Sequence, residues 1–277
     1  MWCVLFAANT QGGILAQFRI IPFGQIDVEL FDKEKPVTVS NFIHYVQSGR
    51  YDDSFFHRCD PTTLIEAGRH YVKNAGNPGQ MLADIQSFGP LPNEYGAGTI
   101  RSNQYGTLAM DRLPGQTNSA TSAWFFNLKD NPAFDARTTN GYFTVFGRVV
   151  SGTNLLNLFR SFTPWTGGPN ETNVVADLSN DFGEDYHQLP LLRGVVSYPN
   201  LVYVDISLLN VQIQRDHDAR AISWNSITGK VNRVEYTTSL PPTWTTLLAT
   251  NPVTPTLTVQ DFSIEANRRF YRVVVEY

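Results

Sequence analysis

The sequence predicts a mainly β protein: a closed antiparallel barrel with two helices, followed by a small C-terminal β-sandwich-like module. Apolar and polar residues alternate in many short segments, and only two segments have apolar residues at helical spacing. Many short strands with few helices are typical of a closed barrel, which leaves no exposed sheet edge. The composition changes after Gln214. We therefore expect the barrel in residues 1–210 and the module in residues 211–277.

The first strand and the first helix are predicted near the N-terminus. Ile26, Val28 and Leu30 alternate with acidic residues, which indicates a half-buried strand. Pro36 suits the first turn of a helix, because its missing N–H would have no partner there. Gly49 is a natural stop for this helix. Between them, apolar residues recur at helical spacing at Val39, Phe42, Ile43 and Val46.

The rest of the barrel alternates loops with short elements. Residues 69–105 are rich in glycine, proline and asparagine, so we expect them to wrap the scaffold rather than form its core. Thr144–Val150 and Leu201–Ser207 are predicted strands, and residues 163–188 are polar and rich in turns. The second helix is predicted from Leu155, Leu158, Phe159 and Phe162.

The C-terminal module begins after a charged link, Arg215–Arg220. Its segments read as strands, with Trp224, Trp244 and Phe270 as core material for a small sandwich. The module resembles the short C-terminal modules of exported bacterial proteins, which favours a periplasmic or secreted location over a cytoplasmic one. A docking or sorting element and a stabilising appendage are both consistent with it.

Size and charge exclude several classes of protein. The chain has 277 residues, of which 42% are hydrophobic and 17% charged, enough to bury a core. Its net charge is −4 and its longest basic run is Arg268–Arg269, so nucleic acid is not an expected partner. No apolar run approaches the ~18–20 residues that span a bilayer. The N-terminus lacks a basic signal-peptide region.

Cysteines, histidines and acidic residues give no metal prediction. Cys3 and Cys59 lie far apart, and both free thiols and a disulfide remain open. The histidines are scattered without zinc spacing. Asp181, Glu184 and Asp185 form an acidic loop, for which a solvated surface is the default and a calcium site the alternative.

Four ordered motifs then give the chain a family resemblance. They are FFHR at residues 55–58, GTLAM at 106–110, NSATSAWFFNL at 118–128 and FTVFG at 143–147. They follow a strand and a helix at 24–51, and together the sequence resembles the cyclophilins over roughly residues 3–206. This resemblance implies an eight-stranded barrel capped by two helices. It also implies a peptidyl-prolyl cis-trans isomerase without a cofactor, acting on proline-containing segments of unfolded or flexible proteins.

The chemistry of that reaction fits the residue types. Rotation of an X–Pro amide has a barrier of ~18–20 kcal/mol, and no covalent bond breaks, so neither nucleophile nor metal is needed. The enzyme must bind the twisted amide more tightly than the planar forms. A fixed guanidinium stabilises the lone pair that develops on the proline nitrogen, while an apolar slot holds the ring.

The resemblance also assigns site residues. Arg58 matches the catalytic arginine of the family, and His57 beside it is expected to be structural because rotation transfers no proton. The substrate-binding residues implied are Phe56, Leu64, Glu66, Met110, Phe125, Phe134 and Phe143.

The chain departs from the family pattern at several of these positions. Glu66 stands where relatives carry a glutamine, Thr63 where they carry a pocket aromatic, and Ala123 where they carry a second glutamine. Two hypotheses therefore stay open: an active isomerase, and a module that binds proline segments with weak or no activity. The oligomeric state is not predicted.

Overall fold

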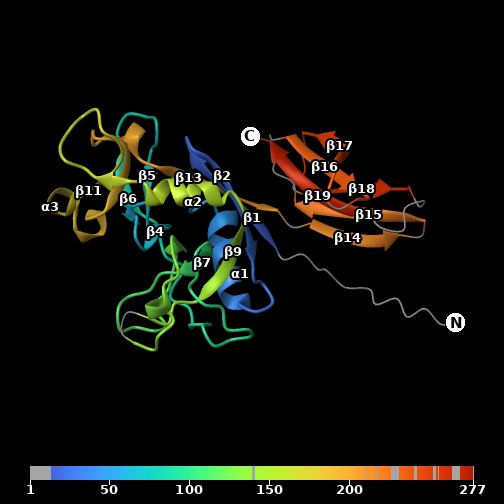
Figure 1. Cartoon of the computed structure of the whole chain (residues 1–277), viewed down its shortest axis with the longest axis horizontal. Coiled ribbons are helices and arrows are strands. Elements are labelled where there is room, and N and C mark those ends of the chain that lie inside the picture. Colours follow the sequence, from blue (N-terminus) through green and yellow to red (C-terminus); the bar gives the residue numbers. More distant parts are fainter. Residues whose placement is uncertain are drawn as a thin grey trace. The chain divides into compact units, whose positions relative to one another are not determined.

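The structure is a computed structural model that describes residues 14–138, 141–209, 211–216, 218–225, 231–239, 242–251, 254, 256–263 and 269–276. The chain forms two compact units: residues 16–207 make up the larger one, and residues 208–277 belong to the smaller one. Each is described on its own (Figure 1). None of the helices in the described residues is long and apolar enough to cross a membrane.

The larger unit is built on a curled sheet of eight strands (Figure 1). The strands follow the order β13-β1-β2-β9-β7-β8-β4-β3, and every pair from β2 to β3 is antiparallel. The fold is therefore mainly β with few helices, as predicted. The strands are β1 (Leu15–Ile21), β2 (Gly24–Leu30), β3 (Arg58–Asp60), β4 (Leu64–Ala67), β7 (Thr107–Met110), β8 (Trp124–Asn127), β9 (Val145–Ser151) and β13 (Tyr203–Leu209).

The two edges of this sheet approach each other without a strand ladder. Within the described residues, β13 and β3 are not paired, so the prediction of a closed barrel is not confirmed. Two backbone hydrogen bonds join the neighbouring segments: the amide of Phe56 donates to the carbonyl of Val202 (2.9 Å), and that of Val204 donates to Ser54 (3.0 Å). The edges of the curled sheet thus meet only through a short bridge.

Helix α1 (Pro36–Gln47) starts with its proline in the first turn, as predicted. A side chain from a distant loop caps it: Glu94 accepts hydrogen bonds from two first-turn amides, at 3.1 and 2.7 Å. A carboxylate there satisfies orphan amides and complements the positive end of the helix dipole. The ammonium of Lys35, a residue that is only 1% exposed, donates to three backbone carbonyls within residues 94–97. This pair of residues fastens the loop to the start of the helix.

The main core lies where the sheet meets the two helices. Helix α2 (Thr153–Arg160) buries Leu155, Leu156 and Phe159, and α1 buries Thr38, Val39, Phe42 and Tyr45. The indole of Trp124 is central, with ring contacts to Phe18, Phe42, Tyr51, Phe56 and Phe126. Gly68 has φ +82°, and a Cβ there would lie 2.7 Å from the Trp124 indole nitrogen, so the tight turn after β4 requires glycine.

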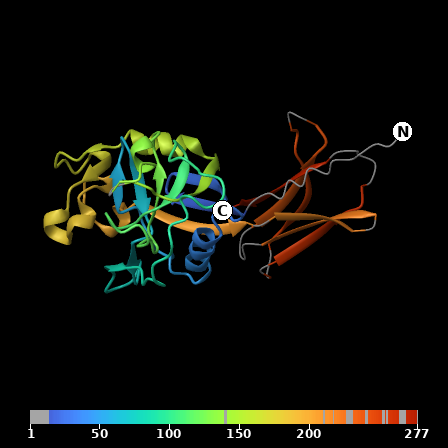
Figure 2. The same ribbon diagram turned by 90° about the horizontal axis from the view of Figure 1, so that it is seen from below.

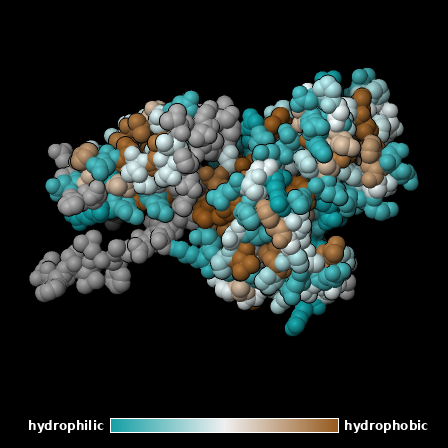
Figure 3. Space-filling view, turned by 180° about the vertical axis from the view of Figure 1, so that it is seen from behind, coloured by the Kyte–Doolittle hydropathy of each residue, from teal (hydrophilic) through white to brown (hydrophobic). Residues whose placement is uncertain are grey.

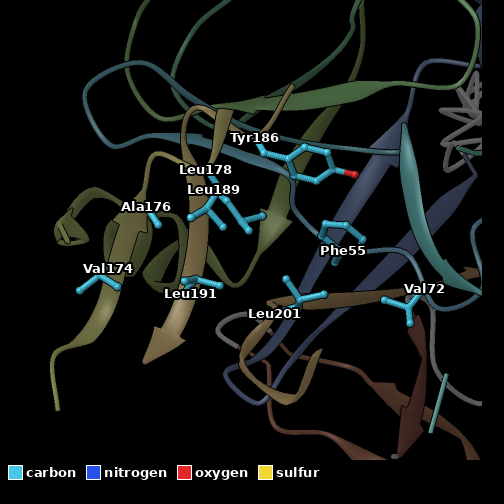
Figure 4. Close-up of a cluster of buried hydrophobic side chains, with 9 residues drawn as sticks. All are labelled: Phe55, Val72, Val174, Ala176, Leu178, Tyr186, Leu189, Leu191 and Leu201. Atoms are coloured by element: carbon cyan, nitrogen blue, oxygen red, sulfur yellow. The ribbon is translucent and has the colours of Figure 1, made fainter. Parts of the chain in front are cut away.

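A second, smaller core supports the segment between α2 and β13. Here β10 (Thr163–Pro164), β11 (Thr172–Ala176) and β12 (Leu189–Arg193) form a three-stranded sheet. Val72 and Leu82 of the hairpin β5 (His70–Lys73) and β6 (Met81–Asp84) pack in the same core. Figure 4 shows the buried side chains of β11 and β12 beside Phe55, Val72 and Leu201. The short helix α3 (Ser179–Phe182) and a 3₁₀ turn (Glu184–Tyr186) join β11 to β12. From the sequence, residues 163–188 were predicted only to be polar and rich in turns.

The smaller unit contains two three-stranded antiparallel sheets (Figure 2). One sheet is β14-β15-β18 and the other is β17-β16-β19. Side chains from both sheets, Ile222, Trp224, Val234 and Val273, form one shared core. The strands are β14 (Val211–Asp216), β15 (Ala219–Asn225), β16 (Val231–Thr237), β17 (Thr245–Thr250), β18 (Thr256–Asp261) and β19 (Phe270–Glu276).

The predicted core aromatics of this unit have different environments. Trp224 is buried and its indole N–H donates to Asn232 Oδ1 (3.1 Å), as expected of a core tryptophan. Trp244 is half-buried, with the Arg272 guanidinium 4.4 Å from its ring. Phe270 is 40% exposed, so its prediction as core was wrong.

The face shown in Figure 3 is mostly hydrophilic with separate hydrophobic patches.

Candidate active site

Four side chains form a row across three strand boundaries of the curled sheet. Arg58 pairs with Glu66, Glu66 with Phe125, and Phe125 with Ala109. Directly paired residues present their side chains on the same face of a sheet, about 5 Å apart. The sheet register therefore fixes a guanidinium, a carboxylate and an aromatic ring in sequence on one face.

The opposite face of the same strands belongs to the main core. Ile65 pairs with Phe126, and Phe126 packs against the rings of Phe18 and Trp124 at 5.1 and 5.6 Å. Phe125 and Phe126 are neighbours on β8, so their side chains point to opposite faces of the sheet. The structure places Phe126 in the core and Phe125 on the face that carries Arg58.

Phe125 forms the floor of an apolar cluster. Its ring makes edge-on contacts with Phe134 at 5.7 Å and with Phe143 at 5.4 Å, and these two rings lie 5.1 Å apart. Leu64, two residues before Glu66 on β4, packs in the same cluster, whose further members are Phe31, Ala109 and Val145. Phe134 and Phe143 are half-buried, so they form the rim of the cluster.

Two of the predicted substrate-binding residues lie elsewhere. Phe56 is fully buried in the main core, with ring contacts to Trp124 at 5.8 Å and Phe159 at 5.4 Å. Met110 pairs with Trp124, which places its side chain on the face opposite to Phe125. The structure thus brings together Arg58, Leu64, Glu66, Phe125, Phe134 and Phe143 and leaves Phe56 and Met110 outside this group.

The side chain of Arg58 is held at two points but is not buried. Its Nε donates to Gln188 Oε1 at 3.1 Å, and its Nη1 lies 3.5 Å from Glu66 Oε2. The side chain remains 35% exposed. Glu66 thus helps to orient the guanidinium, part of which stays open to solvent.

Glu66 sits at the centre of a buried polar network. Its Oε1 lies 3.3 Å from His57 Nε2 and 3.9 Å from Arg69 Nη2. Arg69 in turn lies 2.8 Å from Asp111 and 3.6 Å from Asp185. The two arginines beside Glu66 compensate part of the cost of burying its charge.

Burial changes the proton affinities of this network. It raises the pKa of Glu66, against the opposing effect of Arg58 and then Arg69. Burial, and next the charge of Glu66, raise the pKa of Asp111 to about 7. Burial, together with Arg69, lowers the pKa of His57 to about 3, so this histidine is neutral at pH 7. A neutral, buried imidazole is consistent with the structural role expected for His57.

Sequence reasoning missed four members of this site: Arg69, Asp111, Arg112 and Gln188. Asp111 and Arg112 directly follow the GTLAM motif, so the motif itself could have drawn attention to them. Arg112 donates to the Gly141 carbonyl, and its guanidinium lies 5.1 Å from the Phe143 ring, which ties the rim loop down. Gln188 comes from a segment 130 residues away, and no local pattern announces it.

The predictions on cysteines and metals have mixed outcomes. Cys59 is a free, buried thiol whose pKa is raised by burial, and Cys3 lies outside the described residues. In the part of the chain that the structure describes, no three or more His, Cys, Asp or Glu side chains are arranged to hold a metal ion.

Comparisons with known proteins identify the family of this chain. Residues 16–177 match the family model of the cyclophilin type peptidyl-prolyl cis-trans isomerases. A peptidyl-prolyl cis-trans isomerase of Acinetobacter baylyi is 30% identical over 154 residues, covering 56% of this chain and 76% of that protein. One of Streptomyces antibioticus is 36% identical over 143 residues, covering 50% and 78%. A crystal structure of a Cryptosporidium parvum cyclophilin type isomerase has a TM-score of 0.45 at 17% identity, covering 70% and 98%.

Proposed function

Since the chain belongs to the cyclophilin type peptidyl-prolyl cis-trans isomerase family, we propose that it accelerates rotation about X–Pro bonds by stabilising the twisted amide at Arg58. The observation that carries this mechanism is the row Arg58, Glu66 and Phe125 on one face of the sheet. It places a partly exposed cation beside an apolar floor. The reaction needs both the cation and the apolar surface, and it proceeds without a cofactor.

The dimensions of the sheet suit a proline between these groups. Arg58 lies two strands from Phe125, a separation of about 10 Å between backbones at ~4.8 Å per strand. The guanidinium of Arg58 lies 3.5 Å from Glu66, and Glu66 is the direct strand neighbour of Phe125. In this proposal, a proline ring bound next to Phe125 therefore lies within reach of the guanidinium. The rim formed by Phe134 and Phe143 covers the ring from the other side.

The electrostatic part of catalysis comes from Arg58. As the amide twists, the proline nitrogen becomes pyramidal and gains a lone pair, which a fixed donor stabilises more than it stabilises the planar amide. The guanidinium stays protonated at any physiological pH. Gln188 and Glu66 hold it, so little reorganisation is needed when the substrate twists.

The experiment is the variant Arg58→Ala, assayed by NMR exchange with an X–Pro peptide. We expect kcat/KM to fall by about 10²–10³-fold, the usual loss on removing one preorganised donor. Arg148→Ala is the matched control. It removes an exposed arginine whose Nε lies 2.7 Å from Glu29, and exposed pairs contribute little.

The two open hypotheses give different outcomes in the same assay. If Arg58→Ala turns over the peptide as fast as wild type, the catalytic role of Arg58 is wrong. If the wild-type protein binds the peptide while cis-trans exchange stays at the uncatalysed rate, the chain is a binding module. The clients remain proline-containing segments of unfolded or flexible proteins, in line with the family.

We also propose a closed barrel, a domain boundary and a location for this protein. The curled sheet closes into a barrel, supported by the bonds of Phe56 to Val202 and of Val204 to Ser54; slow hydrogen exchange of the Phe56 and Val204 amides would test it. A domain boundary near residue 210 is supported by the division into compact units. A periplasmic or secreted location rests on the sequence alone, and fractionation of cells that produce the protein tests it.

A further inference from the structure

A cavity of about 580 Å³ lies beside the polar network of the candidate active site, and the apolar cluster of Phe125 does not line it. Its walls are the β5–β6 hairpin and the segment of α3 with the following 3₁₀ turn, which Figure 1 shows at one end of the larger unit. The proposed isomerase mechanism does not use this space. The lining residues are His70, Leu82, Ala83, Asp84, Asp181, Phe182, Gly183, Glu184, Asp185 and Tyr186.

The lining is strongly acidic. It includes the carboxylates of Asp84, Asp181, Glu184 and Asp185, and no lysine or arginine stands among the lining residues. Phe182 is 51% exposed here, an unusual exposure for a phenylalanine beside four carboxylates. Carboxylates combined with an aromatic face are the surroundings that an organic cation prefers.

A buried histidine lines the cavity, and one of its ring nitrogens makes no hydrogen bond to the described residues. His70 is 3% exposed; its Nδ1 lies 2.8 Å from Asp84 Oδ1, and its ring stacks on Tyr186 at 4.9 Å. Its Nε2 makes no hydrogen bond to any of the described residues. The carboxylate of Asp185 lies 3.4 Å from Nε2, but it is not aligned for a hydrogen bond. The tyrosine that carries the stack is shown in Figure 4.

The tautomer of His70 explains why this atom requires a donor. A carboxylate accepts hydrogen bonds only, so Nδ1 carries the proton that bonds Asp84 and Nε2 of the neutral ring is an acceptor. Burial, then the neighbouring His57, lowers the pKa of His70 to about 4. The titratable groups around the His70 ring are His57, Asp84 and Asp185, and Arg69 lies behind Asp185. Two acceptors, Nε2 and Asp185 Oδ2, thus lie 3.4 Å apart with no hydrogen bond between them.

We propose that this cavity binds the ammonium or guanidinium group of a basic side chain near the proline of a client polypeptide. An N–H donor there would satisfy both acceptors and be surrounded by carboxylates. The cavity is linked to the catalytic row through Asp185, Arg69 and Glu66, with distances of 3.6 and 3.9 Å. A chain whose proline lies at Arg58 could therefore place a neighbouring lysine or arginine in it. The proposal thus rests on the proposed isomerase function.

The test compares peptides that differ in one side chain. Proline peptides carrying lysine at successive positions on either side of the proline are compared with peptides carrying norleucine, which has the same length and no charge. At the best position we expect the lysine peptide to bind about fivefold more tightly, the scale of one favourable ion pair. The preference should shrink at about 0.5 M salt, because charges exposed to solvent are screened. The ¹⁵N shift of His70 Nε2 should change only with the lysine peptide.

Variants separate this cavity from the overall negative charge. Asp181→Asn with Glu184→Gln removes two lining carboxylates that contact neither Arg58 nor Arg69, and should abolish the lysine preference. Asp52→Asn with Asp53→Asn changes the net charge equally at exposed positions outside the cavity and should retain it. Equal binding of lysine and norleucine peptides, or a preference that survives in the first double variant, would overturn the proposal.

The readout does not depend on turnover. Dissociation constants are measured by titration in both the wild-type protein and the Arg58→Ala variant. If neither the wild type nor the variant accelerates exchange, the isomerase proposal fails, while the lysine-to-norleucine ratio still reports on the cavity. If exchange is fast and the ratio is one, only the cavity proposal fails.

Discussion

Replacing Glu66 by glutamine should raise the activity of this protein rather than lower it. Glutamine keeps the length of the side chain and an acceptor oxygen for Arg58, so the guanidinium stays oriented. It removes the negative charge 3.5 Å from Arg58 Nη1, which competes with the developing lone pair of the substrate. The change also gives the site the glutamine that the family resemblance leads one to expect at this position.

The size of the effect follows from the distance and the exposure. Two unit charges 3.5 Å apart attract by about 5 kcal/mol at an effective dielectric constant near 20. Arg58 is 35% exposed, and Glu66 divides its charge between Arg58, Arg69 and His57. The net strength of such a part-exposed pair is about 1 kcal/mol. Released to the transition state, this corresponds to about a fivefold increase in kcat/KM.

The assay is kcat/KM for an X–Pro peptide at pH 7.5, with Asp111→Asn as the control. Asp111 carries a carboxylate in the same network but contacts Arg69 rather than Arg58. Removing it should give no gain. A Glu66→Gln variant with unchanged or lower kcat/KM, measured on folded protein, would show that the carboxylate does not restrain Arg58. The reasoning would also fail if both variants gained equally.

Three other expected outcomes follow. The pKa of Asp111 is raised to about 7, from roughly 3.9 in an unfolded chain. The stability that it contributes is therefore present below about pH 4 and lost as the pH rises to about 7. The difference in unfolding free energy between wild type and Asp111→Asn, measured by urea titration, should change over this pH range. A difference that does not vary with pH would contradict the prediction. His57 has the opposite effect on the pH dependence, but it is present in both proteins and cancels in the difference. Phe126→Ala should lower the unfolding free energy by about 3–5 kcal/mol. Phe125→Ala should instead raise KM for a proline peptide. An unchanged KM would show that Phe125 does not contact the substrate. Trp224→Ala should destabilise the smaller unit by about 3–5 kcal/mol in calorimetry, with kcat/KM retained; a parallel loss of turnover would contradict this.

Sequence reasoning succeeded where a pattern reports directly on structure. Alternation in Ile26, Val28 and Leu30 and the proline at position 36 correctly predicted β2 and the start of α1. The family resemblance assigned Phe125 to substrate binding, which stays a prediction. The structure places Phe125 on the face that carries Arg58 and Phe126 in the core. Both residues are apolar and buried, so only their three-dimensional partners distinguish them.

Sequence reasoning failed where the face of a strand matters. The family resemblance assigned Met110 to substrate binding, but its neighbour Ala109 is the residue that shares a face with Phe125. A step of one residue along a strand turns the side chain to the other face. Phe56 precedes Arg58 by two residues, yet it lies before β3 begins and packs into the core.

The polar network could not be predicted for a different reason. Glu66 and Arg69 are three residues apart, but Asp111 and Asp185 meet them only through the fold. Nothing in a single sequence states that these distant charges converge. The acidic loop near Asp181 was recognised as acidic, but its relation to His70 emerges only when the β5–β6 hairpin is placed against it.

The buried ammonium of Lys35 gives this protein a natural reporter of local opening. The three carbonyls that accept its hydrogen bonds shield the amine from solvent, so reagents that acylate lysine can reach it only after the 94–97 segment detaches from α1. Exposed amines such as that of Lys33 react from the native state. The ratio of the two labelling rates, read by mass spectrometry, would therefore measure how often this loop separates from the helix while the remainder of the molecule stays folded.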